Sequence, residues 1–310
     1  MRKILGVNIS HNCSFAYFED GVLKEYYEEE RFNKVKHFVP PDPFYKKYKY
    51  EGLKKFKDII FDNVVIISYD RGHHLIEKPY VDNILEQIKF KDSIFYQKEH
   101  HLSHAMCGYY FSKFKEAIAV VTDGGGERIV NNNFQTVESI IKVDDNTFKK
   151  CYQAATNVRE DFWFDDREVK TKYDKKDWLN DMVDVKLTNG NIGGIKYIKY
   201  LRKAGFNPKE EGQMMGVAAY KNKNTNIDKN VLEIAHKAQE ETLQDRIELI
   251  EKALTYSDCK NIILTGGYHL NCANNFKLVK HFSNLNFFVD PIPYDGGTAV
   301  GIVYYHENYT

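Results

Sequence analysis

Apolar and polar residues follow one another through residues 1–31 in a pattern that predicts three strands. The run KILGVNIS is apolar enough for a buried strand, SFAYFED alternates, and VLKEYYEEER begins as a strand and then becomes charged. Asp20-Gly21 separates the last two runs, and Asp-Gly between alternating segments is a strong hairpin signal. These residues therefore predict the start of a sheet.

The same order of strand, polar turn, strand, turn and strand returns from residue 116 onward. EAIAVVTDGGGE is an apolar run that ends in an acidic, glycine-rich turn. FQTVESIIKVDDNTFKKCYQA supplies two further strand-like runs, which are broken at Asp144-Asp145-Asn146. The two stretches do not share a sequence, so the predicted repeat is one of architecture.

The residues between and after these stretches predict single strands and helices. FDNVVIISYD is typical of a buried strand, and HLIEKPYVDNILEQI is helical in part. HHLSHAMCGYYFSKF favours a helix, although its aromatic residues also suit a strand. Residues 155–195 are charged, aromatic and poorly periodic, which predicts an insertion or an excursion over the surface.

The C-terminal third has the clearest periodicity. Leu243, Ile247, Ile250 and Leu254 recur at helical spacing. NIILTGG and NFFVDPIP are strand-like, whereas HLNCANNFKLVKHF and YDGGTAVGIVYYH are expected to be helices that follow glycine turns. Strands that alternate with helices predict an α/β fold.

Composition narrows the class of protein. The chain has 310 residues, enough for two domains or one two-lobed enzyme with a sizeable core. Apolar residues make up 43% and charged residues 28%, the balance of a globular chain and not of a disordered one. Lys plus Arg and Asp plus Glu both number 44, so we expect no affinity for duplex nucleic acid.

The cellular compartment is predicted from the search for membrane-spanning and signal segments and from the cysteines. No run approaches the ~18 apolar residues of a membrane-spanning helix, and MRKILGVNIS lacks the apolar region and cleavage site of a signal peptide. The five cysteines include no C-x-x-C pair, which predicts reduced, buried thiols. We expect a cytoplasmic protein without membrane contact, and no oligomeric state is predicted.

Three glycine-rich turns follow apolar strands, at residues 123–126, 265–267 and 295–297. Glycine lets backbone N–H groups approach a phosphate, and the N-terminus of a following helix favours an anion. A glycine at the end of a strand is also a common tight connection, so each turn has this simpler interpretation. None of the three fits the P-loop or the dinucleotide G-x-G-x-x-G pattern.

Two histidines, His100 and His104, lie four residues apart in KEHHLSHAMCGYYF. Positions i and i+4 share one face of a helix, so both imidazoles can reach one ion, and imidazole suits Zn, Fe, Ni or Cu. Glu99 and His101 point elsewhere and are not expected as ligands. The alternatives are a polar helix start or histidines hydrogen-bonded in the core. H-E-x-x-H is absent, so a zincin-type protease is not expected.

Seven short segments occur in the order found in the NodU/CmcH-type O-carbamoyltransferases, a family that the chain therefore resembles. The segments are ILGVNISHNCSFAYFEDG, EERFNKVKHF, EHHLSHA, VTDGGGE, MMGVAAY, LTGGYHLNCANN and DGGTAVG. The family's catalytic module is similar to the universal tRNA threonylcarbamoyl transferase subunit. The resemblance implies two ribonuclease-H-like lobes of the actin/hexokinase type: residues 1–115 with the metal-binding helix, and residues 116–310 with the nucleotide-binding turns.

The resemblance also implies a reaction. Carbamoyl phosphate and ATP give carbamoyl-adenylate, and its carbamoyl group passes to a hydroxyl of a small acceptor such as a sugar or nucleotide, with release of AMP. A divalent metal, commonly iron, with zinc or manganese as alternatives, lies in the cleft of such proteins. The ligands implied here are His100, His104, Asp123 and Asp295.

The other site residues follow from the same resemblance. The implied nucleotide contacts lie mostly in the glycine-rich turns: Gly124, Gly125, Gly266, Gly267, Asn271 and Gly296. Arg31 and Lys36 would hold a phosphate or carbamoyl oxygen, or else belong to a solvated charged face. His11 and Asn12 stand where the family has His-Asp, and the chemistry of the acceptor is expected there.

Three departures from the family pattern change these expectations. Asn12 cannot accept a proton as an aspartate would, so His11 is the expected base and Asn12 a substrate contact. Tyr268-His269 replaces two small apolar residues in a nucleotide turn. The sequence stops at Thr310, whereas full-length relatives carry a further C-terminal YrdC-like domain that makes carbamoyl-adenylate. We expect a separate YrdC-like partner to supply this intermediate; the alternatives are a different carbamoyl donor or a remodelled module with another role.

Two other functions stay open from the sequence. A threonylcarbamoyl-type tRNA-modifying subunit shares the histidine spacing, but EERFNKVKHF and HHLSH fit the O-carbamoyl branch better and zero net charge disfavours tRNA. A catalytically decayed nucleotide-binding scaffold would account for Asn12.

Overall fold

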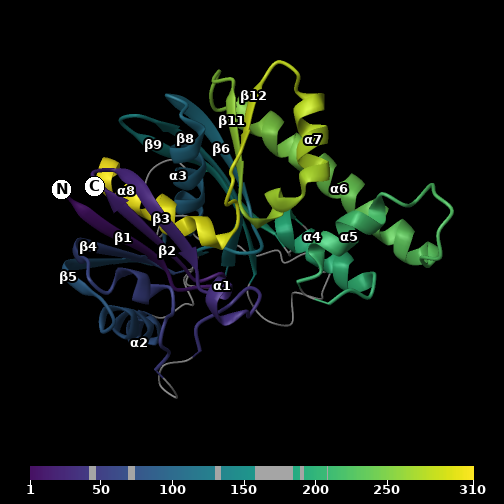
Figure 1. Ribbon diagram of the computed structural model, residues 1–310. Helices are drawn as coiled ribbons and strands as arrows, with labels where there is room; N and C mark the ends of the chain where they lie inside the picture. Colours follow the sequence, from purple (N-terminus) through teal and green to yellow (C-terminus); the bar gives the residue numbers. More distant parts are fainter. Residues whose placement is uncertain (42–46, 69–73, 130–133, 158–183, 189–191, 208) are drawn as a thin grey trace.

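The structure, a computed structural model, describes residues 1–41, 47–68, 74–129, 134–157, 184–188, 192–207 and 209–310. Its strands form two mixed sheets, and helices lie between and beside them (Figure 1). Most of the insertion expected at residues 155–195 lies outside the described residues. Within that range, the structure gives only the end of one strand, one short strand and the start of a helix.

The first sheet contains five strands in the order β3-β2-β1-β4-β5. Their bounds are β1 Lys3–Asn8, β2 Ser14–Glu19, β3 Val22–Glu28, β4 Ile60–Ile67 and β5 Lys89–Tyr96. β1, β2 and β3 are antiparallel, whereas β4 and β5 run parallel to β1. The first three strands and β4 confirm the prediction, and β5 was not predicted.

The second sheet has the order β10-β9-β8-β6-β11-β12, with the short β7 paired to β8. Its strands are β6 Glu116–Thr122, β7 Arg128–Ile129, β8 Phe134–Asp144, β9 Phe148–Asn157, β10 Asp184–Thr188, β11 Asn261–Thr265 and β12 Asn286–Val289. β6, β8 and β9 are antiparallel, whereas β11 and β12 run parallel to β6. The arrangement of the first sheet is thus repeated, which confirms the predicted repeat of architecture.

Five helices confirm the segments predicted as helical: α2 His74–Leu85, α3 His100–Ser112, α6 Lys229–Leu254, α7 Cys272–His281 and α8 Thr298–Tyr309. Three further helices were not predicted: α1 Glu30–Asn33, α4 Gly193–Lys203 and α5 Glu211–Ala218. Short 3₁₀ turns occur at η1 Leu53–Phe56, η4 Gly267–Leu270 and η5 Asp295–Gly297. His100–Ser112 forms a helix despite its aromatic residues, and this helix packs on α8, β6 and β11.

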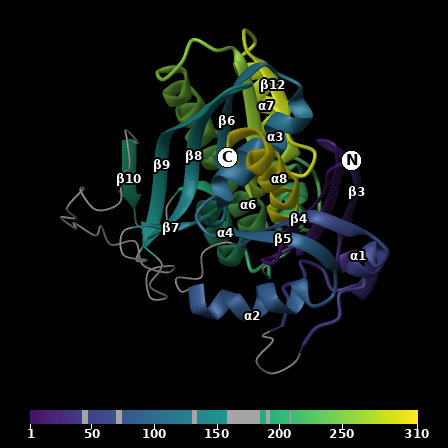
Figure 2. The same ribbon diagram turned by 90° about the vertical axis from the view of Figure 1, so that its left-hand side faces the viewer.

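Helices α3 and α8 cross each other between the two sheets (Figure 2). α8 packs on β1, β2 and β4, although it follows the second sheet in sequence, and α3 packs on β6, β8 and β11, although it precedes them. The close crossing depends on Gly301, where a Cβ would lie 1.8 Å from the Ser103 carbonyl oxygen. The boundary predicted at residues 115/116 therefore divides the strands of the two sheets, but the two central helices cross it.

The five cysteines form no disulfide. Cys13, Cys107 and Cys151 are buried as expected, and Cys259 is half-buried. Cys272 is exposed, contrary to the prediction, because it opens α7 on that helix's outer face. Among the described helices, none is long and apolar enough to cross a membrane.

Candidate metal centre and nucleotide turns

Four side chains predicted as metal ligands come together where the two sheets meet. One ligand atom from each of His100, His104, Asp123 and Asp295 lies within 4.8 Å of the others, and all four residues are buried. The Nε2 atoms of His100 and His104 are 3.2 Å apart, and His100 Nε2 is 3.3 Å from Asp123 Oδ2. Atoms that share an ion at ~2.0–2.1 Å lie roughly 3–3.5 Å apart, so these spacings suit one cation.

Three separate parts of the fold supply these four residues. Both histidines lie on the first turns of α3, on one face, and Asp123 directly follows β6. Asp295 opens η5, and its carbonyl oxygen accepts hydrogen bonds from Asn8 Nδ2 at 3.1 Å and Thr298 Oγ1 at 2.6 Å. Since Asn8 ends β1, the first sheet fixes Asp295, whereas the second sheet provides Asp123.

The electrostatics of the cluster fit a cation. Burial and the nearby Asp123 carboxylate raise the pKa of Asp295 to about 7, against the opposing effect of His100. Burial would lower the pKa of His100, but the Asp295 and Asp123 carboxylates raise it to about 9. Burial and the neighbouring His100 lower the pKa of His104 to about 3. Without a cation the cluster thus balances its carboxylates with protons, and a divalent ion could take over that task.

The donor set also suits a metal. Two imidazole nitrogens with two carboxylates are ligands that iron, zinc and manganese accept. The Nδ1 atoms of His100 and His104 have no hydrogen-bond partner among the described residues, whereas both Nε2 atoms face the cluster. The Nε2 atoms are therefore the ones available to an ion. Glu99 and His101 lie outside the four-residue cluster, as predicted.

The glycine turns of the second sheet converge on Asp123. Gly266 has φ +92° and approaches β6 so closely that a Cβ there would lie 2.3 Å from the Thr122 carbonyl oxygen. The next residue, Gly267, donates its N–H to Asp123 Oδ1 at 3.1 Å. Gly194, at the start of α4, donates its N–H to the Asp123 carbonyl oxygen at 3.2 Å. Three segments distant in sequence thus meet beside the candidate metal centre.

The other predicted nucleotide contacts have defined places. Gly124 and Gly125 follow Asp123, and Gly125 lies against the Gln135 side chain. Gly296 lies next to Asp295, and its carbonyl oxygen accepts a hydrogen bond from Ser14 Oγ at 2.8 Å. Asn271 caps α7 by accepting the Asn274 N–H at 3.2 Å, and it donates to Gln239 at 3.0 Å. A nucleotide contact by Asn271 stays a prediction.

His11 and Asn12 lie in the turn after β1, close to the cluster. The His11 ring stacks on His37, with centroids 5.1 Å apart. Asn12 is buried, has φ +55°, and its Nδ2 lies 3.2 Å from His37 Nδ1 and 3.4 Å from Glu30 Oε2. Burial and the His37 charge lower the pKa of His11 below 6.5, although Asp123 opposes them. His11 is therefore neutral at pH 7 and able to accept a proton.

The two predicted basic contacts lie at the surface. Arg31 is exposed and forms long ion pairs with Glu28 and Glu30, both at 3.9 Å. Lys36 is also exposed, and its Nζ donates to the Lys209 carbonyl oxygen at 2.8 Å. Lys209 returns a hydrogen bond to the Lys36 carbonyl oxygen at 3.1 Å, so this pair links the segment after α1 to the start of α5. The phosphate roles of Arg31 and Lys36 stay predictions.

Two buried charged residues near the centre were missed from the sequence. Glu127 follows the glycines after Asp123 and is 2% exposed, and Arg246 of α6 is 1% exposed. Arg246 forms an ion pair with Glu138 and donates to Thr122 Oγ1 at 2.6 Å, directly before Asp123 of the cluster. The burial of Arg246 could have been inferred from its helical spacing to Leu249 and Ile250, because this spacing places Arg246 on the apolar face of its helix.

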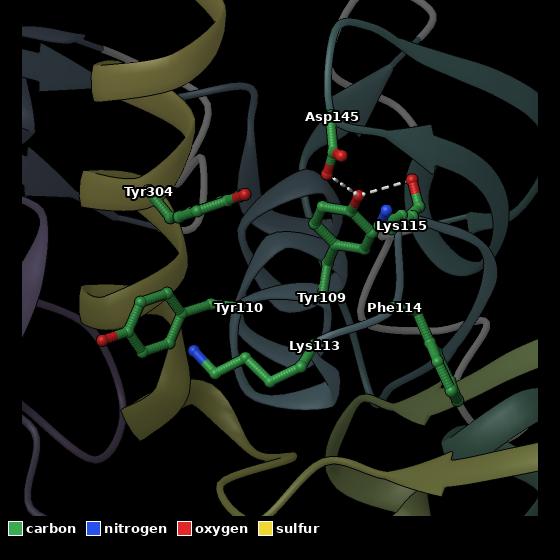
Figure 3. Close-up of a pocket in the computed structure, with 7 residues that line it drawn as sticks. All are labelled: Tyr109, Tyr110, Lys113, Phe114, Lys115, Asp145 and Tyr304. Atoms are coloured by element: carbon green, nitrogen blue, oxygen red, sulfur yellow. Dashed lines mark hydrogen bonds between the residues drawn. The ribbon is translucent and has the colours of Figure 1, made fainter.

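A separate cavity lies at the opposite end of α3 (Figure 3). Its lining is largely aromatic and lysine-rich: Tyr109, Tyr110, Lys113, Phe114, Lys115, Asp145 and Tyr304. The Tyr109 hydroxyl is held by Asp145 Oδ1 at 2.8 Å and the Lys115 carbonyl oxygen at 2.9 Å, and the Lys113 ammonium lies over the Tyr110 ring. At about 230 Å³ it is smaller than the usual ligand pocket of ~300–1,000 Å³.

Comparison with known proteins identifies the class of the chain. The carbamoyltransferase N-terminus family matches residues 43–303, so the chain belongs to that family. A curated relative from Synechocystis sp., the uncharacterised protein sll1178, is 24% identical over 350 residues. The match covers 97% of this chain and 56% of the relative, so the chain spans little more than half the length of that protein.

Solved structures show the same fold at low sequence identity. Full-length HypF in a phosphate- and nucleotide-bound form has a TM-score of 0.58 and 12% identity, over 98% of this chain and 55% of HypF. A sucrose-bound ROK family protein from Streptococcus pneumoniae has a TM-score of 0.55 and 10% identity, over 98% of both chains. A ROK family glucokinase from Streptomyces griseus, bound to glucose and AMPPNP, has a TM-score of 0.51 and 10% identity, over 97% of both chains. The protein thus has the α/β fold of the actin/hexokinase type, as predicted.

Proposed function

We propose that this protein transfers a carbamoyl group from carbamoyl-adenylate, made from ATP and carbamoyl phosphate, to a hydroxyl of a small acceptor such as a sugar or a nucleotide. Membership of the carbamoyltransferase N-terminus family supports carbamoyl transfer. The observation that carries the proposal is the buried cluster of two histidines and two aspartates, brought together from three parts of the chain. Such a cluster beside converging glycine turns suits a phosphate-containing substrate.

His11 is the proposed base. Its neutral imidazole accepts the proton of the acceptor hydroxyl, whose oxygen then forms a bond to the carbamoyl carbon as the bond from that carbon to the AMP oxygen breaks. Asn12 cannot accept a proton, and its contacts with Glu30 and His37 fix the loop that carries His11. Lys36 is proposed to neutralise the charge of the departing phosphate.

The cofactor proposal follows from the donor set. His100, His104, Asp123 and Asp295 would hold a divalent ion, with iron as the first candidate and zinc or manganese as alternatives. Such an ion, when bound, supplies Lewis-acid polarisation of the carbamoyl carbonyl and neutralises phosphate charge. Carbamoyl-adenylate is proposed to come from a YrdC-like partner protein.

The test is a reconstituted reaction. Purified protein is incubated with ATP, carbamoyl phosphate, Fe²⁺ under anaerobic conditions and a panel of nucleosides and sugars, with and without a YrdC-domain protein. We expect AMP, pyrophosphate, inorganic phosphate and an acceptor that has gained one carbamoyl group, only when the YrdC-domain protein is present. Mass spectrometry of the acceptors and chromatography of the nucleotides measure these products.

The matched variants are His104→Ala and His306→Ala. His104 contributes to the cluster, whereas His306 lies on α8, outside the cluster, and contacts Tyr96 of β5. We expect H104A to abolish transfer and H306A to retain it. Nucleotide binding without transfer in every mixture would contradict the proposal and favour a decayed scaffold. Modification of tRNA in place of the small acceptors would favour the threonylcarbamoyl function.

A further inference from the structure

Helix α3 carries two ligands of the candidate metal centre but has no side-chain cap of its own. Its N-cap residue, Glu99, makes no capping hydrogen bond through its side chain. The first N–H groups of a helix have no partner within the helix, so another group must satisfy them.

Glu127 supplies the missing cap from a different segment. Its Oε2 accepts the backbone N–H of His101, the second residue of α3, at 3.1 Å. Its Oε1 accepts from Gln153 Nε2 at 3.0 Å and lies 3.6 Å from the Lys150 ammonium. The Glu127 carbonyl oxygen accepts the Thr136 N–H at 3.0 Å. The carboxylate is thus fixed on the second sheet and lies at the positive end of α3.

The side chain of His101 is held by β8 and by the glycine of the same turn that precedes Glu127. Its Nδ1 lies 2.7 Å from Ser139 Oγ of β8. Its ring packs so closely on Gly126 that a Cβ there would lie 2.4 Å from His101 Cδ2. His101 is therefore fixed through both its backbone and its ring. Because successive residues of a helix are rotated by a constant angle, fixing His101 also fixes the directions of His100 and His104.

Asp123 and Glu127 lie four residues apart in the sequence DGGGE. One carboxylate belongs to the four-residue cluster, and the other caps the helix that carries the histidines. We infer that Glu127 is a positioning residue of the metal centre: it sets the rotation and height of α3 so that both imidazoles reach the ion that Asp123 also binds. This inference rests on the proposed metal centre and assigns to Glu127 a role that the family resemblance did not supply.

The test compares three variants. Glu127→Ala removes the hydrogen bond and the charge, whereas Glu127→Gln keeps an acceptor for the His101 N–H. Glu29→Ala is the matched control, because Glu29 is an equally buried carboxylate that accepts backbone N–H groups, from Glu51 at 2.8 Å and Gly52 at 2.9 Å, in the first lobe. Thermal unfolding measures the stability that each variant loses.

Metal affinity is measured with Fe²⁺ and Co²⁺ by chelator competition, and the Co²⁺ d–d spectrum reports the coordination. Loss of a residue that orients a ligand typically costs about 10–100-fold in affinity, which we expect for E127A together with a changed Co²⁺ spectrum. E127Q should restore most of the affinity. E29A should keep wild-type affinity, even where it destabilises the protein. Hydrogen exchange at the first turn of α3 should accelerate in E127A alone.

The outcomes separate the two proposals. Wild-type metal affinity, spectrum and hydrogen exchange in E127A would overturn the role of Glu127 and leave the metal centre standing. Equal losses of affinity in E127A and E29A would also overturn the role, because they would follow from general destabilisation. A wild-type protein that binds neither Fe²⁺ nor Co²⁺ would overturn the metal centre itself, and this inference with it.

Discussion

His11 should determine the acid side of the pH–rate profile. Burial, then His37, lower the pKa of His11 below 6.5; Asp123 and Glu211 oppose this shift and Lys209 adds to it. The imidazole is therefore unprotonated at pH 7, and as the pH falls through its pKa it takes up a proton and can no longer serve as a base. We expect the transfer rate to be constant around pH 7 and to fall with a midpoint below 6.5, in steady-state assays across the acid range.

The variant His11→Gln tests this assignment. It should lower kcat by about 10²–10⁴-fold, the usual contribution of a general base, and remove the acid limb from the residual activity. Asn12→Asp is the informative companion, since it adds a carboxylate next to His37 and should move the acid limb to higher pH. An acid limb centred above 6.5 in the wild-type protein, or full activity in H11Q, would contradict the role.

Arg246 should be a strong single contributor to stability. It is 1% exposed and paired with Glu138, which is 4% exposed. Arg246→Met leaves the Glu138 carboxylate buried without its partner, which typically costs about 3–5 kcal/mol. The double variant Arg246→Met with Glu138→Leu should lose less free energy of unfolding than the two single variants lose together. Urea unfolding of the wild type, the two single variants and the double variant measures these losses. A loss within about 0.5 kcal/mol in R246M, typical of a surface site, would contradict the prediction.

The sequence predicts the residues of the candidate metal centre better than it predicts the buried charged residues that surround them. The four cluster residues lie in short motifs whose chemistry is visible, and the structure brings them together. Arg246 and Glu127 were not found, because a charged residue between apolar ones resembles a solvated position until the fold buries it. Glu127 closes the segment VTDGGGE, but its partner is a backbone N–H of α3, and no spacing in the sequence indicates that contact.

The crossing of α3 and α8 is the element on which the site depends most. Gly301 to Ala would place a methyl group 1.8 Å from the Ser103 carbonyl oxygen, and backbone cannot move away as a side-chain end can. We expect a loss of about 1–3 kcal/mol or more in the free energy of unfolding, with weaker metal binding, because Ser103 lies between the two histidine ligands. Urea unfolding and metal titration measure the two effects.

Gly216 provides the matched control for this prediction. It lies inside α5, and a Cβ there would meet nothing within 4 Å. Gly216→Ala should therefore stabilise the protein by roughly 0.5–1 kcal/mol, since alanine is the better helix former. Equal effects of the two substitutions would show that the helices do not pack as closely as the structure indicates.

Elements were predicted well where periodicity was strong and poorly where it was not. α6 and the strands around the glycine turns followed from apolar spacing, whereas β5, KFKDSIFY, was missed. β5 is an edge strand with no fully buried residue, so its charged positions conceal the alternation. The packing of α3 on the second sheet and of α8 on the first sheet could not be predicted, because it depends on contacts between residues that are distant in sequence.

At the scale of the whole molecule, the candidate metal centre joins the two sheets. Asp123 extends from the second sheet, Asp295 is fixed by the end of the first, and α3 lies between them. A group that binds ligands from both sides favours the folded arrangement over any state in which the sheets separate.

A metal ion should therefore stabilise the whole fold and not only a local segment. At a free concentration of 100 times Kd, linkage predicts a gain of about 2.7 kcal/mol in the free energy of unfolding. Calorimetry of the wild-type protein with Fe²⁺ or Co²⁺, and again after chelation, should show one transition whose midpoint rises with metal and falls when it is removed. Asp295→Asn should abolish this dependence although it lies far in sequence from the histidines. If metal raised the midpoint of D295N as much as that of wild type, the ion would not bridge the sheets through Asp295, and its ligands would have to come from the second sheet and α3 alone.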